Sequence, residues 1–514
     1  MPALVGIVER TDSCSNAKRI SQMLESLSHG DTGVSTVCIS GSDNGATQWC
    51  ATYPRTYRLQ NVDYRNQNVF LCHTHQMAPQ NAKHISCLLG NHDIQEKSSF
   101  ISRLENSLTT FIMVVEQKDH RIVIRSQDGQ IPLYVAANSD RTIFSTQRKA
   151  LWNLNMPHVA VVFPGDVLTL RDSGHLRVES SLRTGHSFKS QLQMKNIYKN
   201  METLLLNSFS KLRGVDKAAV LFSGGVDSSM AVLLSRKYVD DLTLISAFGD
   251  ESKDQKVAES HARMLDMDVQ KVLLDFDLIW HILPEVIYSI ETTNAMDVEI
   301  AIPFFLSARL AASNGRNLLI SGQGPDEIFA GYARHVRIFK ERGQKALQHE
   351  LIENLSITHE ANIARDMKAI EYSGCEAFFP YLSPPFVQYG LSIPPSYKIA
   401  PEGLPRRKVI FRKICTRMGL PEAIANKVKS ATQYSSGSSK LLLKGIAENI
   451  KKLKGASKRD LRRALPDVLK QIGYIVGIPV RSQREIASEN ELEHAYRFSR
   501  YGRLPAFNQW EDNN

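Results

Sequence analysis

A turn with two glycines, between an apolar run and a helix-like run, constrains the fold of this chain more than any other stretch. The turn is Ser223–Ser229 (SGGVDSS), which follows the apolar run Ala218–Phe222 and leads into Met230–Lys237. Glycine lets the backbone turn tightly and approach an anion, so N–H groups and the next helix's N-terminus can point at a phosphate. Neither a Walker A loop nor a Gly-x-Gly-x-x-Gly fingerprint fits here. The turn therefore predicts a loop that grips a pyrophosphate.

Asp227 lies inside this turn. A carboxylate beside a phosphate cradle repels the ligand unless a divalent cation lies between them, so a bridging Mg²⁺ is implied. The alternative is an ordinary strand–turn–helix joint whose serines cap the helix. The seven residues of the turn, placed together at a strand-to-helix junction, favour the phosphate-binding interpretation.

Length and composition indicate a folded protein of several domains. A chain of 514 residues is expected to form two or three domains, because single cores stop growing near roughly 250–300 residues. The N-terminus carries no signal-peptide pattern, and eighteen apolar residues never run together. We therefore expect a cytoplasmic protein with no membrane partner. The seven cysteines include no Cys-x-x-Cys pair, which argues against a disulfide framework or a zinc site.

The net charge of +10 is mostly local. Between Lys440 and Arg463 nine basic residues stand against two acidic ones, which gives +7 of that total. Leu441–Leu453 shows helical spacing with lysines between the apolar positions, so we predict an amphipathic basic helix packed on the core. A helix that contacts a nucleic acid or an anionic surface is the alternative. No RNA-binding signature with interleaved aromatic residues is present, and we expect no nucleic-acid partner.

The period of the apolar pattern changes along the chain. Up to about residue 185 the runs are strand-like, which predicts a largely antiparallel sheet domain, and they include Val69–Cys72, Thr110–Glu116, Arg121–Arg125, Leu133–Ala137 and Val159–Leu170. From Ile197 onward strand-like and helical runs alternate, as in Ala218–Phe222, Ser229–Lys237, Leu242–Ala247, Lys256–Leu265, Ile302–Ala312 and Leu318–Ile320. That alternation predicts an α/β fold with a parallel sheet wound by helices.

A second glycine-containing turn follows the strand-like run Leu318–Ile320. Its sequence is Ser321–Glu327 (SGQGPDE), and Gly331-Tyr332 follows shortly after. In a doubly wound sheet both turns lie at carboxyl ends of strands, where ligands bind. We therefore expect Asp326 to share the cation with Asp227.

These motifs together resemble the synthetase half of glutamine-dependent asparagine synthetases. The similarity rests on Ser223–Ser229, Ser321–Tyr332, Pro380–Leu382 and Lys408–Arg412, in that order and at family spacing. It implies two domains: an N-terminal α-β-β-α sandwich of the Ntn glutamine amidotransferase type (1–185) and a doubly wound parallel-sheet synthetase domain of the ATP pyrophosphatase type (195–440). The lysine-rich composition that follows predicts a third part, a basic C-terminal extension (441–514).

The resemblance also implies a reaction. ATP adenylates a carboxylate, most simply the side chain of aspartate, pyrophosphate leaves, and ammonia displaces AMP in a step of asparagine biosynthesis. Asp227 and Asp326 would hold Mg²⁺, Asp326 would also be catalytic, and Lys408 would stabilise the adenylation transition state. The residues predicted to hold the nucleotide are Ser223, Gly224, Gly225, Asp227, Ser228, Ser229, Ser321 and Gly322.

Two positions of this half depart from the family pattern. The family usually has Glu where this chain has Gln323, and that Glu is credited with managing protons during amide formation; an amide cannot accept that proton. Ser383 stands where the family has Asp. We still count Gln323 among the catalytic positions. These departures leave open a second interpretation, an ATP-binding pseudoenzyme that serves as a protein-interaction scaffold. A tRNA-modifying adenylase is a third, favoured only by the basic charge.

The N-terminal part departs further. The family hydrolyses glutamine with a cysteine at position 2, but this chain has Pro2, which offers no nucleophile. His75 replaces a glutamine-gripping arginine, and Leu89–Asn91 replaces the oxyanion-hole motif. Arg125 and Gly129 match the family's scaffold motif. We therefore expect the fold without glutaminase activity, with ammonia rather than glutamine as nitrogen donor. The oligomeric state stays open.

Overall fold

A computed structural model describes most of the chain. The described residues are 3–9, 23, 35–40, 47–53, 57–64, 67–74, 110–116, 120–138, 141–171, 176–180, 193–249, 253–400, 407–427, 437–450 and 453–479. Internal contacts divide the chain into two units, Met1–Arg183 with Ile478–Asn514, and Thr184–Gly477.

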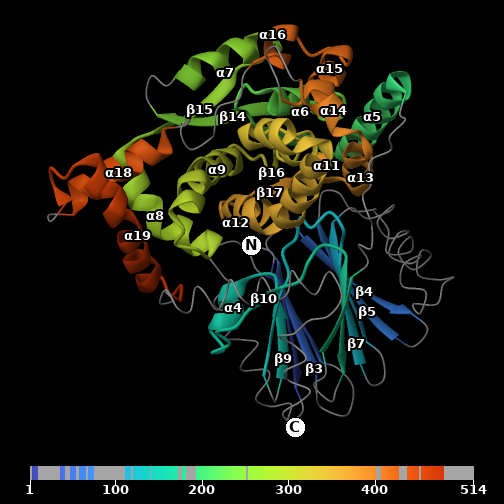
Figure 1. Ribbon diagram of the computed structural model, residues 1–514. Coiled ribbons are helices and arrows are strands. Elements are labelled where there is room, and N and C mark those ends of the chain that lie inside the picture. Colours follow the sequence, from blue (N-terminus) through green and yellow to red (C-terminus); the bar gives the residue numbers. More distant parts are fainter. Residues whose placement is uncertain are drawn as a thin grey trace. The chain divides into compact units, whose positions relative to one another are not determined.

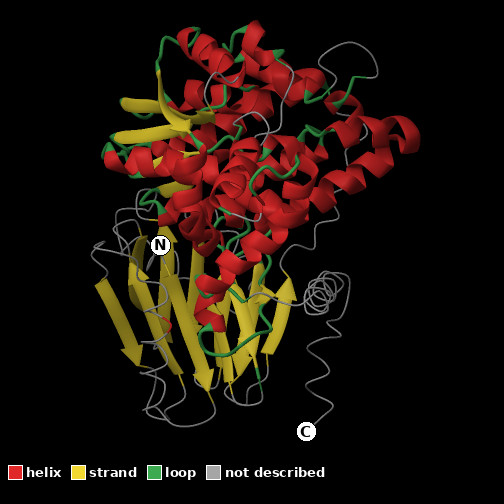
Figure 2. Ribbon diagram, turned by 90° about the vertical axis from the view of Figure 1, so that its left-hand side faces the viewer, coloured by secondary structure: helices red, strands yellow, loops and turns green. Residues whose placement is uncertain are grey.

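The first unit is built from two antiparallel sheets, whose strands are yellow in Figure 2. One sheet has the strand order β10-β8-β9-β1-β3-β2 and the other β12-β11-β7-β6-β5-β4. The elements are β1 (Ala3–Glu9), β2 (Ser35–Ser40), β3 (Thr47–Tyr53), β4 (Tyr57–Tyr64), β5 (Gln67–Thr74), β6 (Phe111–Glu116), β7 (His120–Arg125), β8 (Tyr134–Ala137), β9 (Arg141–Ser145), α4 (Arg148–Trp152), β10 (Ala160–Val161), β11 (Asp166–Arg171) and β12 (Leu176–Ser180).

Alternating apolar residues of the two sheets pack against each other. Val114 and Leu168 of one sheet share a buried cluster with Val135 and Phe144 of the other. The opposite faces of β8 and β9 contact α4 through a second cluster, which includes Tyr134. Two packed sheets with a helix on one outer face agree with the predicted sandwich. A helical layer on the other sheet falls outside the described residues, so the full α-β-β-α arrangement stays a prediction.

The predicted strand Val159–Leu170 is wrong as one element. The chain pairs with β8 at Ala160–Val161, turns at Gly165, and then pairs with β7 and β12 as Asp166–Arg171. Gly165 has φ of +77°, a backbone conformation that glycine adopts without strain. Pro164 and Gly165 therefore carry the chain from one sheet to the other, although the flanking residues look like one apolar run.

The second unit is a parallel α/β domain. Its strands are β13 (Lys217–Leu221), β14 (Asp241–Gly249), β15 (Val269–Leu274), β16 (Leu318–Ile320) and β17 (Glu376–Phe378). Its helices are α5 (Met194–Phe209), η1 (Ser210–Leu212), α6 (Val226–Ser235), α7 (Lys253–Arg263), α8 (Phe276–Ile290), α9 (Ala295–Ser313), α10 (Pro325–Ile328), α11 (Ala333–Thr358), η2 (His359–Ala364), α12 (Arg365–Tyr372), η3 (Pro380–Leu382), α13 (Pro384–Ser392), α14 (Pro395–Lys398), α15 (Val409–Arg417), α16 (Glu422–Ala425), α18 (Ser438–Asn449) and α19 (Lys458–Ile475).

The strand order of this sheet creates a switch point. The order is β15-β14-β13-β16-β17, and each neighbouring pair is parallel, which confirms the predicted parallel sheet. Ala218–Val220 and Leu318–Ile320 are buried at every position, as expected for strands covered on both faces. Figure 1 shows α7 over one face of the strands and α9 over the other. Because the order reverses between β13 and β16, the loops after these strands border a crevice.

The predicted amphipathic basic helix is present as α18. Its apolar residues Leu442, Leu443 and Ile446 are buried, and the helix packs against α8 and α9. The helix runs through residue 440, where we place a domain boundary from the sequence; that division stays a prediction. Among the described residues, no helix combines the length and apolar character needed to cross a membrane.

Arg125 holds the end of β7 to the loops that follow it. The side chain is fully buried, and its Nε and Nη2 donate to the carbonyls of Ile131 and Gly129, each at 2.7 Å. Nη1 donates to the carbonyl of Val162. One guanidinium therefore satisfies three backbone acceptors, which explains why this part of the scaffold motif needs arginine.

We predict that Arg125→Met destabilises the first unit by about 3–5 kcal/mol, because three buried carbonyls lose a charged donor. Urea unfolding combined with hydrogen exchange over residues 111–137 measures the effect. Arg177→Met, at an exposed position of β12, is the control and should change stability by less than about 0.5 kcal/mol. Equal effects of the two substitutions would contradict the role given to Arg125.

Candidate active site

The loop between β13 and α6 is closed by its own serines. The N–H of Ser223 donates to Ser228 Oγ at 3.2 Å, and the two hydroxyl oxygens lie 3.1 Å apart. The N–H of Gly225 donates to Ser223 Oγ at 3.3 Å. Ser223 is exposed, whereas Ser228 is buried at the start of α6. The loop thus presents Ser223 to solvent just before α6 begins.

Helix α7 supports this loop from behind. Gly224 has φ of +66°, and a Cβ there would lie 2.8 Å from the Cα of Ala258. His261, one turn further along α7, has its Nδ1 2.7 Å from the carbonyl oxygen of Gly224. Burial lowers the pKa of His261, although the hydrogen bond to Gly224 opposes that shift. The neutral imidazole therefore donates its Nδ1–H and fixes the turn.

The loop between β16 and α10 lies against the first loop. A Cβ at Gly322 would come within 3.0 Å of the backbone nitrogen of Ser228. The N–H of Ser321 donates to the carbonyl of Phe378 at 2.9 Å, which ties the loop to β17. Gly324, with φ of +117°, passes close to Tyr381. Backbone contact without intervening side chains is what brings the two loops together.

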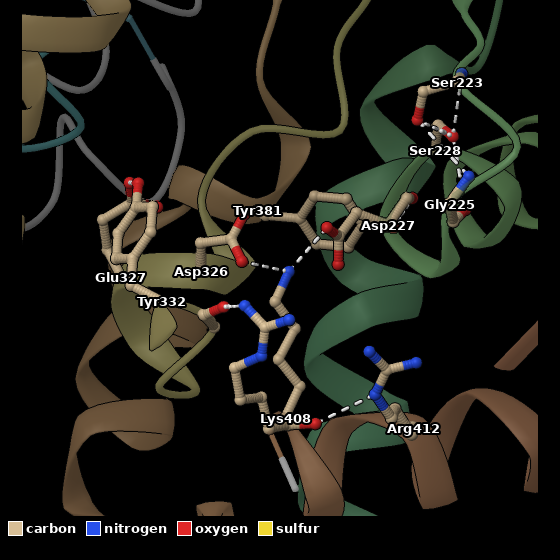
Figure 3. Close-up of polar contacts among 12 residues, drawn as sticks. Ser223, Gly225, Asp227, Ser228, Asp326, Glu327, Tyr332, Tyr381, Lys408 and Arg412 are labelled. Atoms are coloured by element: carbon tan, nitrogen blue, oxygen red, sulfur yellow. Dashed lines mark hydrogen bonds and ion pairs between the residues drawn. The ribbon is translucent and has the colours of Figure 1, made fainter. Parts of the chain in front are cut away.

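Lys408 joins the two loops through their carboxylates (Figure 3). Its Nζ lies 2.6 Å from Asp227 Oδ2 and 2.7 Å from Asp326 Oδ1. The side chain of Lys408 is 2% exposed, and those of Asp227 and Asp326 are 18% and 7% exposed. Because both oxygens contact one ammonium, the carboxylates lie within a few ångströms of each other, as the sequence predicts.

Neighbouring residues fix this triad. Lys408 has φ of +56° and precedes α15, which directs its side chain toward the loops. A Cβ at Gly331 would lie 1.8 Å from Asp326 Oδ1, so only glycine leaves room for the ion pair. The hydroxyl of Tyr381 donates to the backbone carbonyl of Asp227 at 2.9 Å. Arg407 donates to the carbonyl of Gly331 at 2.9 Å.

The glutamate and tyrosine of the second motif form a separate pair. Tyr332 donates its hydroxyl to Glu327 Oε1, and Asn362 Nδ2 donates to the same oxygen at 3.4 Å. Burial, followed by the charge of Glu327, raises the pKa of Tyr332. The phenol therefore stays protonated and acts as a donor that holds Glu327 in place.

The carboxylate pair has the donor type that Mg²⁺ prefers. Asp227 Oδ1 is buried and has no hydrogen-bond partner in the described part of the chain. Mg²⁺ is usually held by one or two carboxylates together with phosphate oxygens and water. No cluster of three or more His, Cys, Asp or Glu side chains that could hold a metal ion occurs among the described residues. Asp227 and Asp326 fit a metal shared with a phosphate.

The two departures from the family pattern lie close to the second loop. Gln323 follows Gly322, and its Nε2 donates to Asp366 Oδ2 at 2.8 Å. Ser383 is 8% exposed and directly precedes α13. The structure therefore pairs Gln323 with a carboxylate on α12 that no sequence motif indicates.

The other predicted positions divide into two groups. Ser229 is fully buried, and its hydroxyl has no hydrogen-bond partner among the described residues. Pro2, His75 and Leu89–Asn91 lie outside the described residues. Sequence reasoning also missed residues that reach the site from elsewhere. Tyr381 belongs to one of the family motifs, but nothing in the sequence points to Asp366 or His261.

Comparison with known proteins identifies the family. The asparagine synthase family model matches residues 201–342 and 339–465, which together span just over half of the chain. A Methanocaldococcus jannaschii protein named putative glutamine-hydrolyzing asparagine synthetase 1 is 27% identical over 417 residues, 72% of this chain and 75% of that protein. Asparagine synthetase B of Escherichia coli is 26% identical over 362 residues, 67% of this chain and 63% of that protein.

A solved structure was also found, a glutamine phosphoribosylpyrophosphate amidotransferase from B. subtilis complexed with ADP and GMP. It covers 68% of this chain and 92% of its own, at 11% identity and a TM-score of 0.28. A score of that size supports no conclusion about the fold. The family model, the two loops and the lysine that joins their carboxylates agree with one another, and the chain belongs to the asparagine synthase family.

Proposed function

We propose that this chain is an ATP-dependent amide ligase that adenylates a carboxylate, with aspartate as the first candidate, and then forms the amide. The observation that carries the proposal is the Lys408 ammonium held between Asp227 and Asp326 at the switch point of the sheet. Family membership supports an ATP-dependent ligase, and the positions of these three residues support the adenylating step.

The electrostatics of the site suit a polyphosphate only when a cation is added. The triad alone carries two negative charges and one positive charge, so it would repel ATP. Mg²⁺, when bound, would neutralise charge on the departing pyrophosphate. Asp227 Oδ1 and Asp326 would hold it, while the Ser223 hydroxyl and the N-terminus of α6 would donate hydrogen bonds to phosphate oxygens. Lys408 would hold a positive charge where negative charge develops.

The reaction balances as two substitutions. In the first, an oxygen of the substrate carboxylate attacks the α-phosphorus of ATP, and the bond to pyrophosphate breaks. In the second, ammonia attacks the activated carbonyl carbon, a proton is lost, and AMP leaves. Fixed, poorly hydrated groups stabilise charge with little reorganisation, which is what the loops and Lys408 would contribute.

The nitrogen donor in this proposal is ammonia. Position 2, where the family has its nucleophilic cysteine, is Pro2, so the N-terminal unit would act as scaffold. A second candidate function, the ATP-binding scaffold, is favoured by Gln323 and Ser383, because both positions lack the carboxylate of the family pattern.

We expect the parent protein to exchange radiolabelled pyrophosphate into ATP with aspartate and Mg²⁺. Asp227→Asn should reduce the exchange by about 100-fold or more, since it removes the charge that would hold the metal. Asp240→Asn, the same change at an exposed position just before β14, is the control and should leave the rate unchanged. ATP binding without exchange in the parent would support the scaffold instead.

Lys408→Met should abolish exchange and lower the free energy of unfolding by about 3–5 kcal/mol, because two largely buried carboxylates lose their shared cation. Thermal unfolding with and without MgATP, run beside the exchange assay, measures both effects. MgATP should stabilise the parent more than the variant. An equally stable and active variant would remove Lys408 from the site.

Ammonium should support amide formation, and glutamine should not. Product analysis by mass spectrometry, with each nitrogen source supplied separately, measures the difference. Release of glutamate from glutamine by the parent protein would contradict the role given to Pro2.

A further inference from the structure

Gln323 is oriented by a buried carboxylate. Its Nε2 donates to Asp366 Oδ2 at 2.8 Å, and Asp366 is fully buried, whereas Gln323 is partly exposed. An ionised carboxylate only accepts hydrogen bonds, so the N–H end of the amide must face Asp366. The carbonyl oxygen, Oε1, therefore points away from Asp366. One hydrogen bond thus sets which end of the Gln323 amide is available at the loop.

Arg365 keeps Asp366 in place. Its Nε and Nη2 lie 2.8 and 2.7 Å from Asp366 Oδ1. Its Nη1 lies 3.2 Å from Asp297 Oδ1 and 3.0 Å from the carbonyl oxygen of Ala361. The π-helical turn His359–Ala364 directly precedes this pair, and such turns are frequent at functional sites. The orientation of Gln323 thus rests on a buried arginine–aspartate pair.

The charge balance of this network favours an amide at position 323. With both carboxylates ionised, Asp297, Arg365 and Asp366 together carry one net negative charge. Burial raises the pKa of Asp366, while Arg365 and the Gln323 amide oppose that shift. A glutamate at position 323 would place a second carboxylate within hydrogen-bond distance of Asp366, and all three nitrogens of Arg365 already have partners. Glutamine therefore fits where an acid would be repelled.

We propose that Asp366 is a positioning residue, which holds Gln323 so that Oε1 accepts a hydrogen bond from a neutral nitrogen nucleophile, ammonia or a small primary amine. This role rests on the ligase function proposed above. An amide carbonyl accepts N–H hydrogen bonds and does not take up a proton near neutral pH. Gln323 would therefore orient the nucleophile, with its lone pair free, rather than deprotonate it.

The two half-reactions separate this role from a purely structural one. Asp366→Asn gives position 366 a hydrogen-bond donor as well as an acceptor. The Gln323 amide can then bind in either of its two flipped orientations. Amide formation should fall by about tenfold or more with a raised KM for ammonium, while pyrophosphate exchange stays within about threefold. Asp297→Asn is the matched control, because it removes the other carboxylate of Arg365 without contacting Gln323. It should change amide formation by less than about threefold.

Gln323→Leu tests the same role if Asp366→Asn fails to fold. It removes Oε1 and keeps the bulk of the side chain, so it should reduce amide formation and leave exchange in place. Equal loss of exchange and amide formation in either folded variant would overturn the proposal.

A double-mutant cycle tests the pair without any activity. Gln323→Glu alone should lower the melting temperature by about 2–4 °C or more through like-charge repulsion. The combined variant Gln323→Glu/Asp366→Asn should regain most of that loss, since the introduced amide at position 366 can donate to the introduced carboxylate at position 323. Additive effects would overturn the pairing. If the parent shows no exchange, the ligase function fails and the nucleophile role with it, while the cycle still reports whether Asp366 orients position 323.

Discussion

One ammonium group organises the parallel α/β unit of this protein. Lys408 lies more than 180 residues from Asp227 and about eighty from Asp326 in sequence, yet its Nζ contacts both carboxylates. Two carboxylates this close, and largely removed from water, repel each other unless a cation lies between them. Lys408, which directly precedes α15, therefore stabilises the meeting of the loops after β13 and β16. The ion pair links the assembly of the fold to the assembly of the site.

Small residues make this meeting geometrically feasible. Gly322 brings its loop onto the backbone of Ser228, and Gly331 leaves the volume that Asp326 and Lys408 occupy. Gly224 needs both a left-handed conformation and room beside Ala258. A methyl group at Gly322 or Gly331 would push apart elements whose charged groups must lie within about 3 Å, and one at Gly224 would push the first loop away from α7. The glycines of the two motifs thus allow the two loops to approach each other, in addition to allowing each loop to turn.

The sequence predicts what local pattern can encode. The alternation of strand-like and helical runs predicts the parallel sheet, and the strand–turn–helix punctuation places both loops at carboxyl ends of strands. The sequence-based prediction is wrong where one apolar run contains strands of two different sheets, as on either side of Gly165. Apolar spacing does not show which neighbour a strand will pair with. Asp366 and His261 carry no local signal at all, since their roles come from contacts across the fold.

The position of Gln323 shows why a missing carboxylate is not evidence of a lost function by itself. Considered alone, glutamine at that position removes a proton acceptor from the loop. In the structure the Gln323 amide donates to Asp366, so a carboxylate is present one hydrogen bond further from the loop. Arg365 neutralises part of the charge of that carboxylate. The net charge around Gln323 is therefore set by Asp297, Arg365 and Asp366 rather than by residue 323 itself. In the proposed role, turnover depends on the direction in which the carbonyl oxygen of Gln323 points, and the hydrogen bond to Asp366 sets that direction.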